Sequence, residues 1–379
     1  MTRSGVGAAR RVVIKLGTRV LTHDDGTLAL GRLFGLIESA ARLRRSGREV
    51  LVVSSGAVGL GRESLGLEGA LLLADRQACA AVGQTRLMQL YSDGFSRLGL
   101  VAGQLLLTQS DFDDRMRYLN LRSTLESMLA HGAVPIINEN DAVATDELAF
   151  VGDGDRPVFG DNDRLSALVA SKLGADLLVL LTDVDGVFDR DPRQHRDASL
   201  LSTLHDDDVL VAGPSVSGGG RGGMTSKIEA ARMASRAGCH AVIGSGRTSG
   251  ALAGVLRGES IGTWLPADPN SHDARRRWIA FATAPRAVLH LDDGAVRAVR
   301  DKGASLLAVG VQRIEGSFEG GDVVELRGGD GKVLGRGLVW CDSGTALRWI
   351  EGKAPENARN HHALVHRNHL ALMPERTSL

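Results

Sequence analysis

The stretch Arg11–Arg19, which reads Arg-Val-Val-Ile-Lys-Leu-Gly-Thr-Arg, decides the fold. Its β-branched run, Val12 to Ile14, predicts a short buried strand, and Gly17 then allows the backbone to turn away. Lys15 is therefore expected at the carboxyl end of that strand. Ligands of open parallel α/β sheets bind outside the carboxyl ends of the strands, so Lys15 either points toward a ligand or simply solvates a strand end.

The composition favours a soluble protein of two or three domains. The chain has 379 residues, with 45 Lys plus Arg and 45 Asp plus Glu. A formal net charge of zero gives no reason to expect a general nucleic-acid or membrane-surface binder. Cys79, Cys239 and Cys341 lie far apart, which excludes a disulfide framework and a Cys-x-x-Cys metal site. No signal peptide and no apolar run of about 18 residues is visible, so we expect a cytoplasmic protein without a membrane span.

Apolar runs alternate with helical patterns over the first two thirds of the chain. The expected strands after the first are residues 49–54, 101–107, 133–138, 177–181, 240–243 and 262–265. The expected helices cover residues 30–46, 71–82, 86–98, 110–130, 164–172 and 228–237. Pro135 lies inside one of these strands, which indicates a strand start or an edge position.

Polar clusters follow several of these strands. One strand runs into Ser54-Ser55-Gly56-Ala57, and another ends in Asn138-Glu139-Asn140-Asp141. Gly160-Asp161-Asn162-Asp163 precedes the helix at 164–172, and Thr182-Asp183 follows the strand at 177–181. Such residues cap helices and form turns for local reasons. The same groups also supply acceptors for an ammonium group, donors for a carboxylate and oxygen ligands for Mg²⁺.

A glycine-rich segment opens the helix that begins near residue 228. Gly213–Gly223 holds six glycines, and Met224-Thr225-Ser226-Lys227 follows. Backbone N–H groups and the positive end of the helix dipole bind phosphate in such segments. Lys227 is unfavourable in the first turn of a helix, so a ligand anion would explain it. The alternative is a flexible surface loop with a chance lysine, and the pattern matches neither the Walker motif nor Gly-x-Gly-x-x-Gly.

The last quarter of the chain has a different pattern. From about residue 285, short apolar runs are separated by turns rich in Gly and Asp, which predicts a small β-rich domain. His366 and His369 lack a nearby third ligand, so no metal site is expected there. We expect a catalytic domain at 8–265, a linker at 266–284, a β-rich domain at 285–365 and a tail at 366–379.

Taken together, these motifs resemble the glutamate 5-kinase family, whose order they follow along nearly the whole chain. The motifs are Val13-Ile14-Lys15-Leu16-Gly17-Thr18, Ser54-Ser55-Gly56-Ala57, Asn138-Glu139-Asn140-Asp141-Ala142-Val143, Gly160-Asp161-Asn162-Asp163, Leu181-Thr182-Asp183 and Gly222-Gly223-Met224-Thr225-Ser226-Lys227. The β-rich end resembles a PUA domain. The resemblance implies an amino-acid-kinase-like αβα sandwich with a mostly parallel sheet, followed by a small PUA-like barrel. It also implies ATP-dependent phosphorylation of the L-glutamate γ-carboxylate, the first step of proline biosynthesis, with ATP and Mg²⁺.

The resemblance assigns roles to individual residues. Lys15 and Lys227 would contact the phosphoryl group in transfer, and Asp163 would orient both lysines. The residues that would hold glutamate are Ser55, Gly56, Asn138, Asp141, Asp161 and Asn162. The residues that would hold ATP are Lys15, Thr182, Asp183, Arg221, Gly222, Gly223, Met224, Thr225, Ser226 and Lys227. No metal ligand is assigned.

The resemblance also implies inhibition by proline and assembly into a dimer or tetramer, and it makes a glutamyl-phosphate reductase a plausible partner. The spacer at 142–159 is longer than in familiar members, and Arg221 stands where a small hydroxyl residue is usual. Two alternatives stay open: another amino-acid or carbamate-type kinase of the same fold, and an RNA-binding protein that uses the PUA-like domain. The neutral charge and the two tyrosines argue against a large RNA surface.

Overall fold

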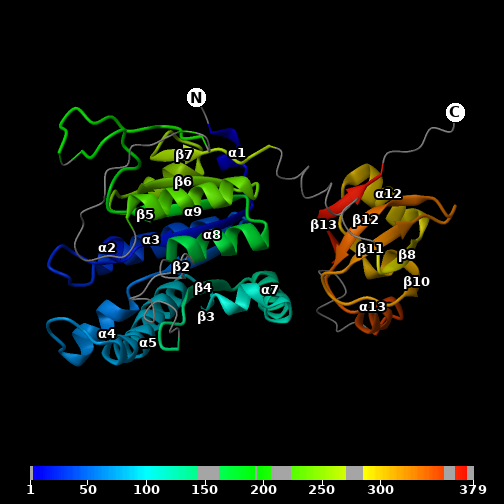
Figure 1. The fold of residues 1–379 in the computed structure, drawn as a ribbon, viewed down its shortest axis with the longest axis horizontal. Helices are drawn as coiled ribbons and strands as arrows, with labels where there is room; N and C mark the ends of the chain where they lie inside the picture. Colours follow the sequence, from blue (N-terminus) through cyan, green and yellow to red (C-terminus); the bar gives the residue numbers. More distant parts are fainter. Residues whose placement is uncertain are drawn as a thin grey trace, which may run out of the picture. The chain divides into compact units, whose positions relative to one another are not determined.

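The computed structural model describes residues 3–143, 162–192, 194–205, 208, 223–269, 285–353 and 363–373. The chain divides into two units, Met1–Asp268 and Pro269–Leu379 (Figure 1). The predicted spacer at 142–159 lies almost wholly outside the described residues, as does most of the predicted linker.

The first unit is built on a seven-stranded sheet in the order β3-β4-β2-β1-β5-β6-β7. Strand β1 is central, and the order of the strands reverses there because β2 and β5 pair with its two sides. Only β7 is antiparallel to its neighbour among the described strands of this sheet. The strands are β1 (Arg11–Leu16), β2 (Glu49–Ser54), β3 (Ala102–Leu107), β4 (Val134–Glu139), β5 (Leu177–Thr182), β6 (His240–Ser245) and β7 (Thr263–Leu265).

Alternation along each strand builds a separate core on each face of the sheet. In β1, Ile14 and Leu16 join the core that α3, α5 and α10 complete, whereas Val13 joins the core of α7, α8 and α9. The helices of this unit are α1 (Ser4–Gly7), α2 (Thr18–Leu21), α3 (Leu30–Arg45), α4 (Ala57–Leu65), α5 (Leu73–Arg97), α6 (Ser110–Asp113), α7 (Arg115–Ala130), α8 (Asn162–Leu173), α9 (Met224–Arg236) and α10 (Ala251–Leu256). This confirms the predicted sandwich with a mostly parallel sheet.

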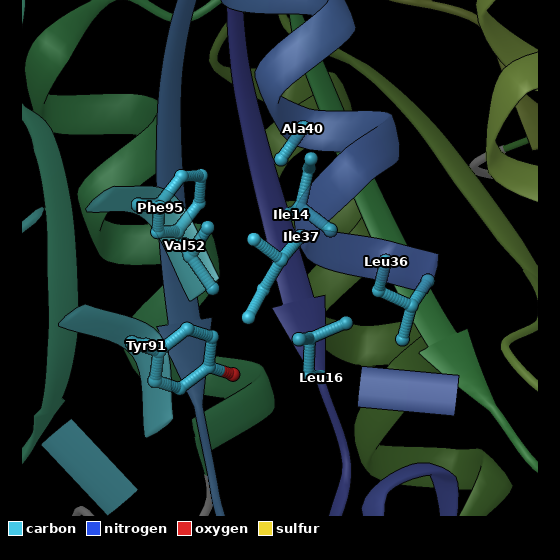
Figure 2. A pocket seen from close by; sticks show the side chains of 8 residues that line it. All are labelled: Ile14, Leu16, Leu36, Ile37, Ala40, Val52, Tyr91 and Phe95. Atoms are coloured by element: carbon cyan, nitrogen blue, oxygen red, sulfur yellow. The ribbon is translucent and has the colours of Figure 1, made fainter. Parts of the chain in front are cut away.

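Figure 2 shows a small apolar cavity in the core that α3 and α5 share with the sheet. Its side chains come from β1, β2, α3 and α5, and its volume of about 10 Å³ has room for a single water at most. The lining is hydrocarbon except for the hydroxyl of Tyr91, which bonds to Ser54 instead. The cavity is therefore a packing defect of the core and not a ligand site.

Two helix predictions are wrong, and both errors have a physical reason. The helices expected at 71–82 and 86–98 form one continuous helix, α5. Gly83 does not interrupt it; a Cβ at Gly83 would collide with the carbonyl oxygen of Ala57, so the glycine lets α5 pack closely on α4. The single helix expected over 110–130 is divided into α6 and α7 at Asp114, whose carboxylate accepts the backbone N–H of Arg117 as an N-cap.

The second unit is β-rich, as predicted. Its six-stranded sheet has the order β10-β8-β11-β12-β13-β9. Asp292 and Asp342 cap the helices α12 and α13 by accepting the backbone N–H groups of Ala295 and Thr345. Strand β13 crosses residue 366, where the sequence analysis starts a tail, because its residues pair with β12 on both sides of that point. The elements are β8 (Ala287–Leu291), α12 (Asp293–Lys302), β9 (Leu306–Leu307), η2 (Ala308–Gly310), β10 (Val311–Gly316), β11 (Val323–Arg327), β12 (Val333–Val339), α13 (Ser343–Ile350) and β13 (Ala363–Leu372).

The contact between α4 and α5 can be tested with two glycines of α4. A Cβ at Gly61 would collide with the backbone carbonyl of Cys79, whereas a Cβ at Gly59 meets nothing within 4 Å. We expect Gly61→Ala to lower the free energy of unfolding by roughly 1–3 kcal/mol, because backbone must move to admit the methyl group. The control Gly59→Ala should be neutral or stabilising by up to about 1 kcal/mol, since Ala favours helix. Urea unfolding followed by circular dichroism compares the two; equal stabilities would contradict the close packing.

Candidate active site

The carboxyl ends of four neighbouring strands carry the polar residues of the site. In the sheet order β4-β2-β1-β5, these ends present Asn138, Ser54 with Ser55, Lys15 and Thr182. Lys15 is level with Val53 of β2 and Leu180 of β5, one residue from the end of β1. The strand order reverses at β1, which is where open parallel sheets bind their ligands.

Three buried charged groups meet at this edge. Side chains alternate between the two faces of a strand, and Ile14 and Leu16 point toward α3 and α5. Lys15 therefore points to the opposite face, which α8 and α9 cover. Its Nζ is 2.5 Å from Oδ1 of Asp163, and Nζ of Lys227 donates to Oδ2 of the same carboxylate at 3.1 Å. Asp163 is 0% exposed, Lys15 3% and Lys227 7%. The carboxylate of Asp163 thus contacts both lysines.

The electrostatics of this trio favour an anion. Burial alone would raise the pKa of Asp163, but Lys15 and Lys227 outweigh it and hold that pKa at about 2. One ionised carboxylate facing two ammonium groups leaves a net positive charge in a buried place. Asp163 and Lys227 lie in the first turns of α8 and α9, whose N-termini add further positive potential. Lys227 is unfavourable in the first turn of α9, and the carboxylate of Asp163 offsets part of that cost.

Neutral polar side chains form a hydrogen-bonded chain beside the lysines. Nδ2 of Asn162 donates to Oγ of Ser55 at 3.0 Å and to Oδ1 of Asn138 at 3.1 Å. Nδ2 of Asn138 in turn donates to Oε1 of Gln84 at 2.8 Å. Ser55, Asn138 and Asn162, which were assigned to glutamate, are therefore brought together.

Gly56 and Asp141 flank this chain. Gly56 has a φ of 109° and forms the N-cap of α4, a backbone conformation that favours glycine. Asp141 lies just beyond β4, and burial raises its pKa while Arg76 opposes the rise. Among the residues that the structure describes, Asp141 makes no hydrogen bond or ion pair with the chain. Asp161 lies outside the described residues.

The residues assigned to ATP lie on β5, on α9 and in the segment before α9. Oγ1 of Thr182 donates to Oδ1 of Asp183, and Arg19 pairs with Oδ2 of Asp183 at 3.3 Å. Partial burial would raise the pKa of Asp183, but hydrogen bonds from its own backbone N–H and from the side chains of Thr182 and Arg19 lower that pKa overall. Oγ of Ser226 donates to the carboxylate of Asp163 at 3.1 Å.

The remaining residues assigned to ATP are less informative. Gly223 is the N-cap of α9, Met224 packs against the core of that face, and Thr225 is exposed. Arg221 and Gly222 lie outside the described residues.

Sequence reasoning missed Gln84 and Arg19. Arg19 directly follows the opening motif, so its place near a strand end was visible, but its partner Asp183 is 164 residues away. Gln84 lies between the two helices that were expected at 71–82 and 86–98. Its contact with Asn138 comes from the packing of α5 and leaves no local signal.

Metal-binding clusters and membrane-spanning helices are both absent from the described part of the chain. It contains no cluster of three or more His, Cys, Asp or Glu side chains arranged to hold a metal ion. In that same part, no helix has the length and apolar character needed to cross a lipid bilayer.

The parallel sheet, with Lys15 from β1 and Lys227 from α9 on one buried carboxylate at its edge, is that of a phosphotransferase class. Residues 10–245 match the model of the amino acid kinase family, and residues 287–361 match the PUA domain. The chain belongs to the amino acid kinase family.

Curated relatives narrow the placement within that family. The chain is 44% identical to the glutamate 5-kinase of Thioalkalivibrio sulfidiphilus, covering 98% of this chain and 99% of that one. It is also 44% identical to the glutamate 5-kinases of Shewanella oneidensis, over 97% of this chain and 98% of that one, and of Synechococcus elongatus, over 95% and 99%. Among amino acid kinases, the chain groups with the glutamate 5-kinases.

Asp163→Asn tests the electrostatic role of the trio. The variant leaves two buried ammonium groups without a carboxylate, so we expect it to cost roughly 3–5 kcal/mol of unfolding free energy at neutral pH. Because the pKa of Asp163 is depressed in the folded state, its contribution is present above about pH 4 and is lost as the pH falls toward 2.

The stability difference between wild type and Asp163→Asn should therefore shrink below about pH 4. Urea unfolding from pH 7 downward measures it, with the exposed Asp93→Asn as the matched control. A difference that is the same at every pH would show that the charge of Asp163 is not what matters.

Proposed function

We propose that this chain transfers the terminal phosphoryl group of ATP to the side-chain carboxylate of L-glutamate, giving L-glutamyl 5-phosphate, the first step of proline biosynthesis. The observation that carries the proposal is the carboxylate of Asp163 holding two buried lysines where four strand ends meet. The similarity to the glutamate 5-kinases supports glutamate as the acceptor.

The residues suit an acceptor that needs no activation. A γ-carboxylate, with a pKa near 4.3, is already ionised at neutral pH, so no general base is required. The difficulty is the approach of two anions, whose repulsion at about 4 Å is roughly 4 kcal/mol at an effective dielectric of 20. Lys15 and Lys227 offset this repulsion, and catalysis rests on positioning and charge neutralisation.

The chain of neutral side chains suits the amino-acid end of the site. Ser55, Gly56, Asn138 and Asn162 would bind glutamate, with Asp141 and Asp161 as acceptors for its ammonium group. Thr182, Asp183 and residues 221–227 would bind ATP, with backbone N–H groups at the start of α9 facing phosphate. Mg²⁺ fits the proposal as an ion held mainly by the phosphates and water, which is its usual mode in kinases.

Membership of the family also supports proposals on regulation and partners. We expect inhibition by proline, assembly into a dimer or tetramer, a cytoplasmic location and transfer of the labile product to a glutamyl-phosphate reductase. RNA binding by the PUA domain is the second candidate. A filter-binding affinity that falls steeply with salt would support it.

The direct test is ATP turnover with Mg²⁺ and L-glutamate, in which hydroxylamine traps the acyl phosphate. Aspartate, N-acetylglutamate and carbamate are the competing acceptors. Glutamate-dependent hydroxamate that decreases on addition of proline is the expected result. Turnover with a different acceptor alone would overturn glutamate as the substrate and favour another kinase of this fold.

Lys15→Ala and Lys227→Ala should each lower kcat by at least about 100-fold, because each removes a positive charge from the transferring phosphoryl group. The matched control is Lys172→Ala, at the exposed end of α8, which should leave kcat within about twofold. Circular dichroism shows whether the variants are folded. Near-normal turnover in either folded site variant would contradict the proposed mechanism.

A further inference from the structure

Gln84 is a buried polar residue that no assigned role explains. It lies on α5, is 7% exposed, and accepts a hydrogen bond from Nδ2 of Asn138 at 2.8 Å. Its own Nε2 is buried and has no hydrogen-bond partner among the described residues. A buried amide donor without a partner costs free energy, so such a group needs an explanation.

The contacts of Asn138 fix the orientation of the whole amide chain. Oδ1 of Asn138 accepts the backbone N–H of Glu139 at 2.9 Å, and a backbone N–H can only donate. The other end of the Asn138 carboxamide must therefore be its NH₂, which needs an acceptor. Oε1 of Gln84 is that acceptor.

The same logic extends to Asn162. Because Oδ1 of Asn138 faces it, Asn162 must turn its NH₂ inward, where it donates to Asn138 and to Ser55. Its carboxamide oxygen is then left over, and Oδ1 of Asn162 is indeed buried without a partner among the described residues. A carboxamide oxygen in that state is an acceptor ready for an ammonium group.

Helix α5 holds Gln84 in a fixed place. Gly83 packs against the backbone of Ala57 at the start of α4, and Tyr91 hydrogen-bonds Ser54 at 2.8 Å at the end of β2. Gln84 and Tyr91 are seven residues apart, which places them on one face of the helix. That face therefore contacts both β2 and β4 at the ends that carry Ser55 and Asn138.

We propose that Gln84 is a positioning residue for the amino-acid acceptor. The backbone N–H of Glu139 sets which end of the Asn138 carboxamide is its oxygen, and Gln84 accepts from the NH₂ at the other end and so holds that carboxamide in place. Asn162 then donates to Asn138 and offers an oxygen, not an NH₂, to the ammonium group of the acceptor. The inference rests on the proposed function, because it takes an amino acid as the bound molecule. It predicts a defect in acceptor binding that spares ATP.

The test compares Gln84→Met with Gln89→Met in the full-length chain. Met keeps the length of Gln but removes the strong acceptor, and Gln89 is an exposed glutamine on the same helix. Initial rates give KM for glutamate and for ATP separately. We expect Gln84→Met to raise the glutamate KM by about tenfold to a hundredfold, the range of one broken buried hydrogen bond, with the ATP KM within about twofold. Gln89→Met should change neither.

A double-mutant cycle tests whether Gln84 acts through Asn138. In an Asn138→Ala background, Gln84→Met should add less than about threefold to the glutamate KM, because the group that it positions is gone. If Gln84→Met does not fold, Gln84→Asn is the second variant; its amide is one methylene short of Asn138 and should show the same selective defect.

Three results would overturn the inference: an unchanged glutamate KM, equal rises of both KM values, or fully additive effects in the cycle. Failure of the proposed function looks different. In that case wild type itself gives no glutamate-dependent hydroxamate, whereas failure of this inference alone leaves an active wild type and a Gln84→Met variant with normal glutamate affinity.

Discussion

The site depends on one buried carboxylate that two ammonium groups share. Removing three charged groups from water is costly, and a buried ion pair is weak evidence for stability, since apolar side chains of similar size often serve as well. Asp163 and its two lysines are therefore better explained by what they do than by what they stabilise. With one negative charge against two positive charges, the trio holds a positive potential ready for an anion, with no reorganisation at the moment of reaction.

This arrangement is possible because of the periodicity of β1. Side chains alternate between the faces of a strand, so Lys15 shares its face with Val13 and lies among the helices that carry Asp163 and Lys227. A shift of one residue in β1 would place the lysine in the opposite core. The hydrophobic pattern of Val12, Ile14 and Leu16 therefore sets the position of the Lys15 ammonium group as well as the fold.

The sequence predicts this part of the protein well, because its signals are local. A β-branched run marks β1, polar clusters mark the strand ends, and glycines mark the start of α9. The contact of Asp163 with both lysines was implied only by resemblance. Asp163 is 148 residues from Lys15 and 64 residues from Lys227 along the chain, so no local pattern indicates the contact. The helices expected at 71–82 and 86–98 show the opposite failure: they form one helix, α5, and Gly83 between them lets α5 pack closely on α4. The contact of Gln84 with the site was missed for the same reason, because Gln84 lies in the gap between the two expected helices.

Charged and neutral groups occupy separate parts of the site. The side chains that we propose for the acceptor, Ser55, Asn138, Asn162 and Gln84, are all uncharged and hydrogen-bonded to one another. Burial raises the pKa of Asp141, just beyond β4. Neutral amides can recognise both ends of an amino acid through their orientation, without cancelling the positive charge of the lysines. Recognition by orientation is exacting, however, because a carboxamide turned by 180° exchanges donor for acceptor. A helix packed as closely as α5 supplies the rigidity that such a site requires.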